Sequence, residues 1–306
     1  MRISRREQMV RIEAPAKINL FLEIIARRQD GYHELETFMA TVGIYDTIEF
    51  YRTEESSIEL TCRLGLRPGR RRAPADDAPE DLPAGGDNLV HRALVALQRA
   101  SGCSEGARVR LHKRIPWQAG LGGGSTDAAA ALWAANLGWK LGWSRPKMAE
   151  FSSQLGSDIP FFFWGGAAVC RGRGEQVAPV AAARRLPLVV VVPDRGLATP
   201  DVFRDAKVPP TPQSARAWES GWRDAVPTPS LPPLFNRLER PAEQIEPTVA
   251  AARRTLRAGG AQDVRMSGSG SSCFGICRSM HHARRVAARV RARGWNRTYV
   301  TSTVEA

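Results

Sequence analysis

The sequence predicts an α+β protein with two domains. Segments with strand-like alternation and segments with helix-like spacing follow one another in mixed order, and no internal repeat is visible. At 306 residues the chain is long for a single hydrophobic core, so we expect two domains, residues 1–182 and 183–306. The 43% hydrophobic and 25% charged residues are typical of a globular protein.

The expected N-terminal domain begins with strands. Residues 10–53 combine apolar runs with alternation on both sides of the turn Asp30-Gly31, and residues 56–62 continue this pattern. Residues 63–87 are rich in Arg, Pro, Asp and Gly and have no apolar period, which predicts a long, mobile loop. The further predicted elements are a helix over 87–102, a strand over 107–116, a helix ending near 138, a helix over 144–156 and a buried strand pair over 157–180.

The expected C-terminal domain opens with the apolar β run at 184–194. Residues 200–235 carry many prolines and little periodicity, which predicts loops with short helices. The remaining predicted elements are a helix over 242–260, two strands around a glycine turn over 263–278, a helix over 280–294 and a strand over 296–306.

The chain has a formal net charge of +13, which attracts anions of any kind, including nucleic acid, membrane surfaces and phosphorylated metabolites. Five of its basic residues are Lys and 39 are Arg, spread along the sequence with denser clusters at 67–72 and 281–297. Aromatic residues are not interleaved with them as in RNA-binding proteins. We therefore expect a solvated basic surface and no nucleic-acid partner.

Cysteine usage and hydropathy suggest a cytoplasmic protein. No run of about 18 apolar residues is present, and the basic N-terminus lacks the apolar region of a signal peptide, so no membrane association is expected. The five cysteines are odd in number and scattered, which favours free thiols. Cys273 and Cys277 form an isolated C-x-x-x-C, which we interpret as two core residues and not as a metal site.

The most informative stretch is a glycine-rich segment at the start of a predicted helix. Residues 120–127 are GLGGGSTD, and a run of helix formers follows. Successive glycines let backbone amides turn inward as an anion nest, and a helix N-terminus adds unpaired amides. The segment lacks the Lys of G-x-x-x-x-G-K-[ST] and the third glycine of G-x-G-x-x-G. A plain tight turn is the alternative, but phosphate binding is favoured, with hydroxyls at 125 and 126 as further donors or metal contacts.

The segment from Pro116 to Thr126 resembles the P-x-x-x-G-L-G loop of the GHMP kinases, a family of small-molecule kinases. Six further segments resemble the branch of this family that acts on a cytidine-diphosphate-linked methylerythritol: residues 14–24, 29–38, 155–175, 199–203, 234–242 and 266–275. The resemblance implies a ribosomal-protein-S5-like N-terminal domain that binds ATP and carries catalysis. It also implies a ferredoxin-like C-terminal GHMP domain that completes the substrate cleft.

The same resemblance implies a reaction. The γ-phosphate of ATP would pass to the 2-hydroxyl of 4-diphosphocytidyl-2-C-methyl-D-erythritol, in the non-mevalonate synthesis of isoprenoid precursors. ATP and Mg²⁺ are the implied cofactors, because ATP phosphates require the metal. No carboxylate cluster indicates a metal site, so no protein ligand of Mg²⁺ is assigned. The small-molecule substrate is the expected partner, and the oligomeric state is left open.

Lys17 and Asp158 are the catalytic residues that the resemblance implies. A lysine inside the apolar segment around residue 17 is costly unless its ammonium is paired, although a lysine at a strand end extends to solvent instead. Asp158 precedes a Pro-Phe-Phe-Phe run, and a turn or helix-cap aspartate is its alternative. By resemblance, Asp158 acts as a base or orients the hydroxyl, and Lys17 pairs with it and with the reacting oxygen.

The resemblance also implies ligand contacts. Tyr32 and Phe203 would sandwich the cytosine ring, with core packing as the alternative for either ring. His33 would hydrogen-bond the polar edge of the base, and Asn19, two residues after Lys17, would bond the substrate from the same strand face. The implied ATP contacts are Pro116, Trp117, Gln118, Ala119, Gly120, Leu121, Gly122, Gly123, Gly124, Ser125 and Thr126, with Asn88 and Lys113. A second glycine turn at 268–270 is expected beside this loop.

Two other functions are open at this point. A GHMP kinase acting on homoserine or mevalonate has no base to stack, so the segments at 30–33 and 199–203 argue against it. A basic RNA-binding protein with an inactive S5-like domain has no need of Lys17, Asp158 and a complete glycine loop.

Overall fold

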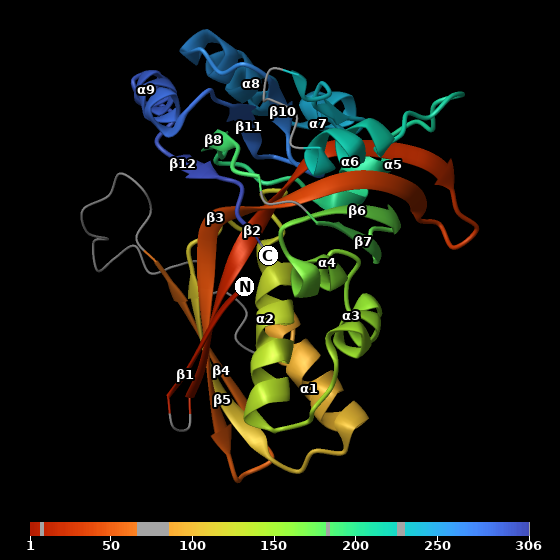
Figure 1. The fold of residues 1–306 in the computed structure, drawn as a ribbon, viewed down its shortest axis with the longest axis vertical. Helices are drawn as coiled ribbons and strands as arrows, with labels where there is room; N and C mark the ends of the chain where they lie inside the picture. Colours follow the sequence, from red (N-terminus) through yellow and green to blue (C-terminus); the bar gives the residue numbers. More distant parts are fainter. Residues whose placement is uncertain (7–8, 66–85, 182–183, 225–229, 306) are drawn as a thin grey trace. The chain divides into compact units, whose positions relative to one another are not determined.

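The computed structural model describes residues 1–6, 9–65, 86–181, 184–224 and 230–305 (Figure 1). Most of the loop predicted at 63–87 lies outside these residues. The chain forms two compact units. The first holds residues 1–16, 44–115 and 123–164, and the second holds residues 17–43, 116–122 and 165–306. The domain boundary expected after residue 182 stays a prediction.

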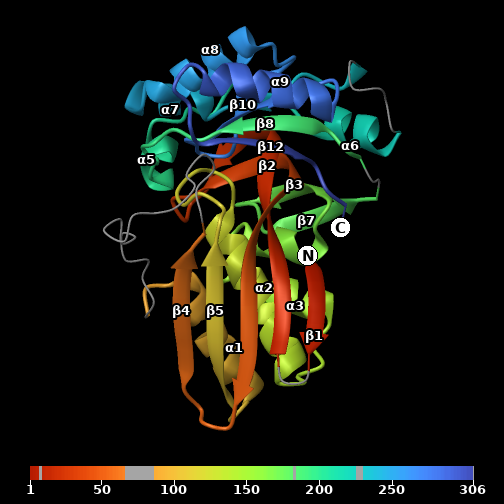
Figure 2. The ribbon, with the colours of Figure 1, turned by 90° about the vertical axis from the view of Figure 1, so that its left-hand side faces the viewer.

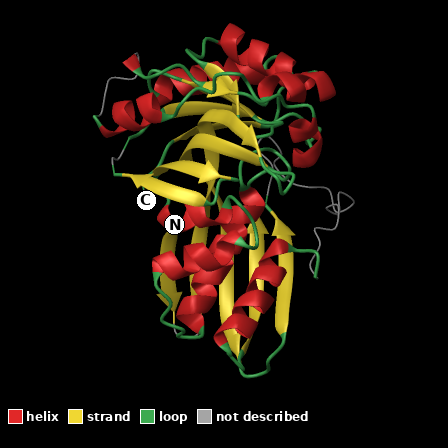
Figure 3. Cartoon of the chain, turned by 90° about the vertical axis from the view of Figure 1, so that its right-hand side faces the viewer, coloured by secondary structure: helices red, strands yellow, loops and turns green. Residues whose placement is uncertain are grey.

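The first unit is a sheet covered by helices. Its strands lie in the order β1 (Arg2–Arg6), β2 (Met9–Arg27), β3 (His33–Thr53), β5 (Gly106–Lys113) and β4 (Ile58–Leu64). Residues 9–16 of β2 and 44–53 of β3 belong to this unit, and the rest of both strands belongs to the second unit. β3 and β5 are antiparallel, and β4 runs parallel to β5. Helices α1 (Leu89–Ser101), α2 (Gly123–Gly138) and α3 (Arg145–Ser153) lie on one face of this sheet (Figures 2 and 3).

Helix α2 is the element that the glycine loop leads into, and it is buried on most sides. Small side chains, mostly alanines over residues 128–135, let it approach its neighbours closely. At its last residue, a Cβ added to Gly138 would lie 2.4 Å from Cε1 of Phe50 on β3. The helix is therefore fixed against the sheet, which keeps its first turn in a defined place.

The second unit contains a four-stranded antiparallel sheet of order β10 (Val264–Met266), β11 (Cys273–Ile276), β8 (Pro187–Val191) and β12 (Thr298–Ser302). Helices α8 (Thr248–Gly259) and α9 (Met280–Arg291) pack on it around Leu256, Val286 and Val290. Its other elements are β6 (Ala167–Gly172), β7 (Gln176–Val180), α5 (Thr199–Arg204), α6 (Arg216–Arg223), β9 (Phe235–Asn236) and α7 (Glu239–Ile245).

Two element predictions were wrong. Residues 157–180 were expected to be two strands, but Ile159–Trp164 form the helix α4 before β6 and β7. A short run that is apolar on every side has no period with which to distinguish a buried strand from a buried helix. Residues 242–260 were expected to be one helix, but the chain is extended at Glu246 and a second helix starts after Pro247. Proline disfavours the helical conformation of the residue before it.

The described helices include none that is both long and apolar enough to cross a membrane. All five cysteines are free thiols, and Cys170, Cys273 and Cys277 are buried.

Candidate active site

The first half of the glycine loop, residues 116–122, is held in the second unit by its carbonyl groups. Three consecutive carbonyls accept hydrogen bonds from outside the loop: Ala119 from the backbone N–H of Ser272 (3.1 Å), Gly120 from the hydroxyl of Ser267 (2.9 Å) and Leu121 from the backbone N–H of Lys17 (2.9 Å). These acceptors are engaged by the protein, so they are not left to repel a bound anion.

Two glycine turns pack against each other in this unit. Gly120 has a φ of +72°, and a Cβ there would lie 2.1 Å from the carbonyl oxygen of Ser267. Gly268, in the turn between β10 and β11, would bring a Cβ within 3.3 Å of the carbonyl oxygen of Gly120. The prediction that the turn at 268–270 lies beside the loop is therefore confirmed.

The second half of the loop, residues 123–126, forms the first turn of α2 in the first unit. The amides of a first helical turn have no intrahelical partners and form the positive end of the helix dipole. A Cβ built at Gly124 meets no atom within 4 Å, so this part of the turn faces open space. The Oγ1 atom of Thr126 is buried and has no hydrogen-bond partner among the described residues. These features fit a phosphate group placed over the turn.

Lys17 lies within β2 in the second unit and is only 4% exposed. Its ammonium donates to Oδ1 of Asn19 at 2.7 Å, so the two side chains share one face of the strand as predicted. Asn19 in turn donates to Oγ1 of Thr37 at 2.9 Å, and a Cβ at Gly268 would lie 3.2 Å from the Lys17 ammonium. Lys17 is thus a buried lysine held beside the second glycine turn, not one that extends to solvent.

Three further predicted residues lie in the first unit. Asp158 is half-buried in the turn directly before α4. Asn88 caps α1, where its Oδ1 accepts from the backbone N–H of Val90 at 2.9 Å. The ammonium of Lys113 is buried and bonded to two carboxylates. The catalytic and ATP-binding roles of all three stay predictions.

The predicted base-binding residues lie in the second unit. Tyr32 is 56% exposed in the turn between β2 and β3, and the guanidinium carbon of Arg173 lies 5.1 Å from the centre of its ring. His33 stacks on Phe203 of α5, with ring centres 5.4 Å apart. Burial, with the positive charge of Arg27, lowers the pKa of His33, so its neutral ring can donate from one nitrogen and accept at the other. The cytosine sandwich between Tyr32 and Phe203 stays a prediction.

Several residues of this region were missed in the sequence. Asp46 is the one charged residue of the segment 38–48, and this isolated charge was a usable signal in the sequence. The structure buries Asp46 fully. Asp127, in the first turn of α2, was given no role, but it is buried against Lys113. Ser267 gave no signal, because its hydrogen bond to the loop spans 147 residues of sequence.

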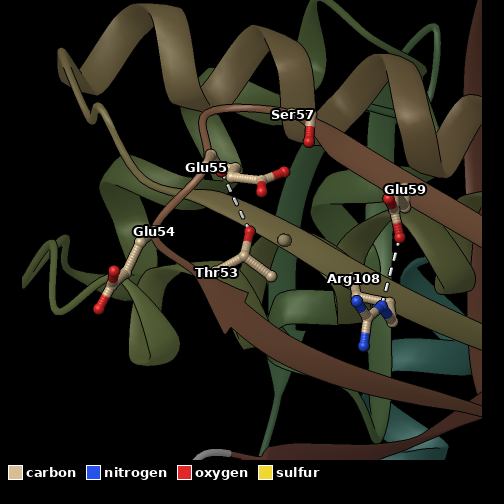
Figure 4. Close-up of a pocket in the computed structure, with 7 residues that line it drawn as sticks. Thr53, Glu54, Glu55, Ser57, Glu59 and Arg108 are labelled. Atoms are coloured by element: carbon tan, nitrogen blue, oxygen red, sulfur yellow. Dashed lines mark hydrogen bonds and ion pairs between the residues drawn. The ribbon is translucent and has the colours of Figure 1, made fainter.

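A cavity of about 330 Å³ lies elsewhere in the first unit (Figure 4). It is lined by the end of β3 and the starts of β4 and β5, with three glutamates, Glu54, Glu55 and Glu59, and Arg108. Lys113 is the last residue of β5, so this acidic cavity and Lys113 lie at opposite ends of one strand. None of the predicted site residues is among its lining residues.

Comparison with known families defines the class of this fold. Residues 88–166 match the GHMP kinases N terminal domain, and residues 230–295 match the GHMP kinases C terminal domain. The crystal structure of homoserine kinase from Cytophaga hutchinsonii has a TM-score of 0.71 at 16% identity, covering 99% of this chain and 97% of that one. The fold is that of the GHMP kinases, so the predicted α+β class is confirmed.

Relatives along the whole chain narrow the class to one family. The chain is 40% identical over 284 residues to 4-diphosphocytidyl-2-C-methyl-D-erythritol kinase of Pelotomaculum thermopropionicum, covering 91% of this chain and 92% of that protein. Identity to the kinase of the same name from Prochlorococcus marinus is 37% over 290 residues, covering 88% and 85% of the two chains. A crystal structure of 4-(cytidine 5'-diphospho)-2C-methyl-D-erythritol kinase has a TM-score of 0.78 at 33% identity, covering 97% of this chain and 100% of that one. The chain belongs to the 4-diphosphocytidyl-2-C-methyl-D-erythritol kinase family.

Two loop glycines give a matched test of the phosphate site. In Gly124→Ala the new methyl group meets no protein atom, and alanine in a helix is favoured over glycine by about 1 kcal/mol, so the Tm should not fall. The methyl group enters the open space over the helix start, so the KM for ATP should rise by about 10-fold or more. Steady-state kinetics beside thermal unfolding measure both effects.

Gly120→Ala is the contrasting variant, because its methyl group would meet backbone and its φ is positive. Its Tm should fall by about 4 °C or more. An unchanged ATP KM in a well-folded Gly124→Ala protein would contradict phosphate binding at this turn.

Proposed function

We propose that this protein transfers the γ-phosphate of ATP to the 2-hydroxyl of 4-diphosphocytidyl-2-C-methyl-D-erythritol, in the non-mevalonate synthesis of isoprenoid precursors. The observation that carries the proposal is the glycine segment itself, with its carbonyls anchored over residues 119–121 in the second unit and its open helix start at Gly124 in the first. The family to which the chain belongs supports the choice of substrate. The free thiols are consistent with a cytoplasmic enzyme.

The loop residues are proposed to bind the ATP phosphates through backbone amides. Phosphoryl transfer needs positioning and positive charge more than covalent help from the protein, and helix-start amides supply both. Mg²⁺ held on the ATP phosphates would neutralise their charge, and a hydroxyl at Ser125 or Thr126 is available to it. Ser125 is part-exposed, whereas Oγ1 of Thr126 is buried and has no hydrogen-bond partner among the described residues, so Ser125 is the more accessible of the two hydroxyls.

Asp158 and Lys17 are proposed to act on the substrate hydroxyl. Asp158 accepts its proton, or holds the hydroxyl in line, from the turn before the apolar helix α4. Lys17 offsets the negative charge that develops on the reacting oxygen. Its ammonium is already desolvated and oriented by Asn19, so little reorganisation is needed when that charge appears.

The cytidine base is proposed to bind at the turn between β2 and β3. Tyr32 is an exposed aromatic whose ring is backed by the guanidinium of Arg173, which leaves the opposite face of the ring for stacking. His33, held against Phe203, offers both a donor and an acceptor to the edge of a pyrimidine.

A coupled ADP-release assay tests the function. With Mg²⁺ and ATP we expect turnover of 4-diphosphocytidyl-2-C-methyl-D-erythritol, and none of homoserine or mevalonate. Turnover of homoserine or mevalonate instead would contradict the proposed substrate. Tight, salt-dependent RNA binding without ADP release from any substrate would favour the basic RNA-binding alternative.

Asp158→Asn is expected to lower kcat by about 10²–10⁴-fold, because the amide cannot take the hydroxyl proton. ATP affinity should change little. Asp194→Asn is the matched control, since the Asp194 side chain is 97% exposed and takes no part in the proposed reaction. Near-normal turnover of Asp158→Asn would remove Asp158 as the base.

Tyr32→Ala is expected to raise the KM for the cytidyl substrate more than it lowers kcat, because stacking on a base is worth about 1–3 kcal/mol. Tyr32→Phe keeps the ring and should keep the KM within about twofold. If the alanine variant retains the wild-type KM, Tyr32 does not stack on the base.

A further inference from the structure

Three charged side chains form a buried cluster beside the glycine loop. Lys113 ends β5, Asp46 lies in β3, and Asp127 lies in the first turn of α2, all within the first unit. The Lys113 ammonium donates to Oδ2 of Asp127 at 2.6 Å and also to Oδ2 of Asp46. All three are at most 6% exposed.

The composition of this cluster is costly for the fold. Two carboxylates and one ammonium are removed from water, and an apolar trio of similar size would avoid that desolvation. Burial alone would lower the pKa of Lys113, but the carboxylates of Asp127 and Asp46 raise it above its ordinary value, so the ammonium stays charged. Burial raises the pKa of Asp127 well above its ordinary value, against the attraction of Lys113 and with the repulsion of Asp46. A role other than stability is therefore indicated.

The cluster reaches the chain on both sides of the loop. Before the loop, Oδ1 of Asp46 accepts from the backbone N–H of Ile115 at 2.8 Å and from that of Arg114. After the loop, a Cβ added to Gly123 would lie 3.1 Å from the Lys113 ammonium. Asp127, one turn into the helix, binds the same ammonium. Through Asp46, the Lys113 ammonium thus connects Ile115, the residue before Pro116, to the first turn of α2.

We propose that Asp46, Lys113 and Asp127 are positioning residues for ATP, which set the spacing between the two ends of the glycine loop and so the directions of its amides. The inference rests on the proposed binding of ATP phosphates by this loop. Lys113 then serves ATP through the loop and not as a direct ligand, because its ammonium is already engaged by two carboxylates. Amides that are held in place lose less entropy on binding than amides of a free glycine chain.

The two aspartates differ in a way that gives a sharp test. Both oxygens of Asp46 face donors, so an asparagine at 46 sets its NH₂ against a donor whichever way the amide is turned. Oδ1 of Asp127 has no hydrogen-bond partner among the described residues. Asp127→Asn can therefore turn its NH₂ to that side and keep its carbonyl on Lys113.

Calorimetric titration of the full chain measures the effect on each ligand separately. With Mg²⁺ and the ATP analogue AMP-PNP, Asp46→Asn should weaken binding by about 10–100-fold, as for loss of a residue that orients a ligating group. In the same Asp46→Asn variant, the affinity for 4-diphosphocytidyl-2-C-methyl-D-erythritol should change by less than about twofold. In Asp127→Asn, the affinity for AMP-PNP should fall by less than about threefold. Leu256→Ala, which opens a cavity in the core under α8, controls for a general loss of stability.

Three results would overturn the inference. If Asp46→Asn binds AMP-PNP as well as the wild type or more tightly, Lys113 acts as a direct ligand or not at all. If Asp46→Asn loses both ligands equally, as a destabilised protein would, the cluster is only structural. If the wild-type chain does not bind AMP-PNP, the proposed function fails first. Should Asp46→Asn not fold, Asp46→Glu keeps the charge but displaces it by one methylene, and the same selective loss of AMP-PNP is expected.

Discussion

A glycine-rich loop cannot hold itself in place, and the structure around it is arranged to do so. Glycine leaves the backbone free, so a loop of this composition loses more conformational entropy on binding than any other. In the second unit, donors from Ser272, Ser267 and Lys17 engage three successive loop carbonyls. In the first unit, the first turn of α2 starts against Lys113. The proposed phosphate binding by amides depends on this external support, because the glycines of the loop have no side chains to supply it.

The same constraint connects Lys17, the proposed catalytic lysine, to the loop. Lys17 contributes its backbone N–H to the loop carbonyl of Leu121 and its ammonium to Asn19, so one residue anchors the loop and presents charge. A substitution of Lys17 that kept the charge but shifted the strand would disturb both the hydrogen bond to the loop and the position of the ammonium. A buried ammonium requires acceptors, and Oδ1 of Asn19 supplies one to Lys17.

Local patterns were enough to predict most of the fold. The helix start at Asn88, the glycine loop before α2 and the strand pair around the turn at 268–270 each carry a signal within a few residues. One error fell where that signal is absent, in the all-apolar helix α4, and the other overlooked the local signal of Pro247 between α7 and α8. The residues of the candidate site also differ in whether a local pattern reveals them. The glycine loop and Lys17 stand out in the sequence, whereas Ser267 and Asp46 act through partners 147 and about 70 residues away along the chain, which pattern alone cannot pair.

Backbone amides as the phosphate ligands are the central claim, and selective ¹⁵N-glycine labelling tests it most directly. Titration with Mg²⁺ and AMP-PNP, followed by amide NMR, reports each glycine N–H separately, and alanine variants assign the signals. If loop amides bind the phosphates, the signals of Gly122, Gly123 and Gly124 should shift strongly and that of Gly294, which follows α9, should change little. Saturable binding of the analogue that leaves the three loop glycines unmoved would contradict it.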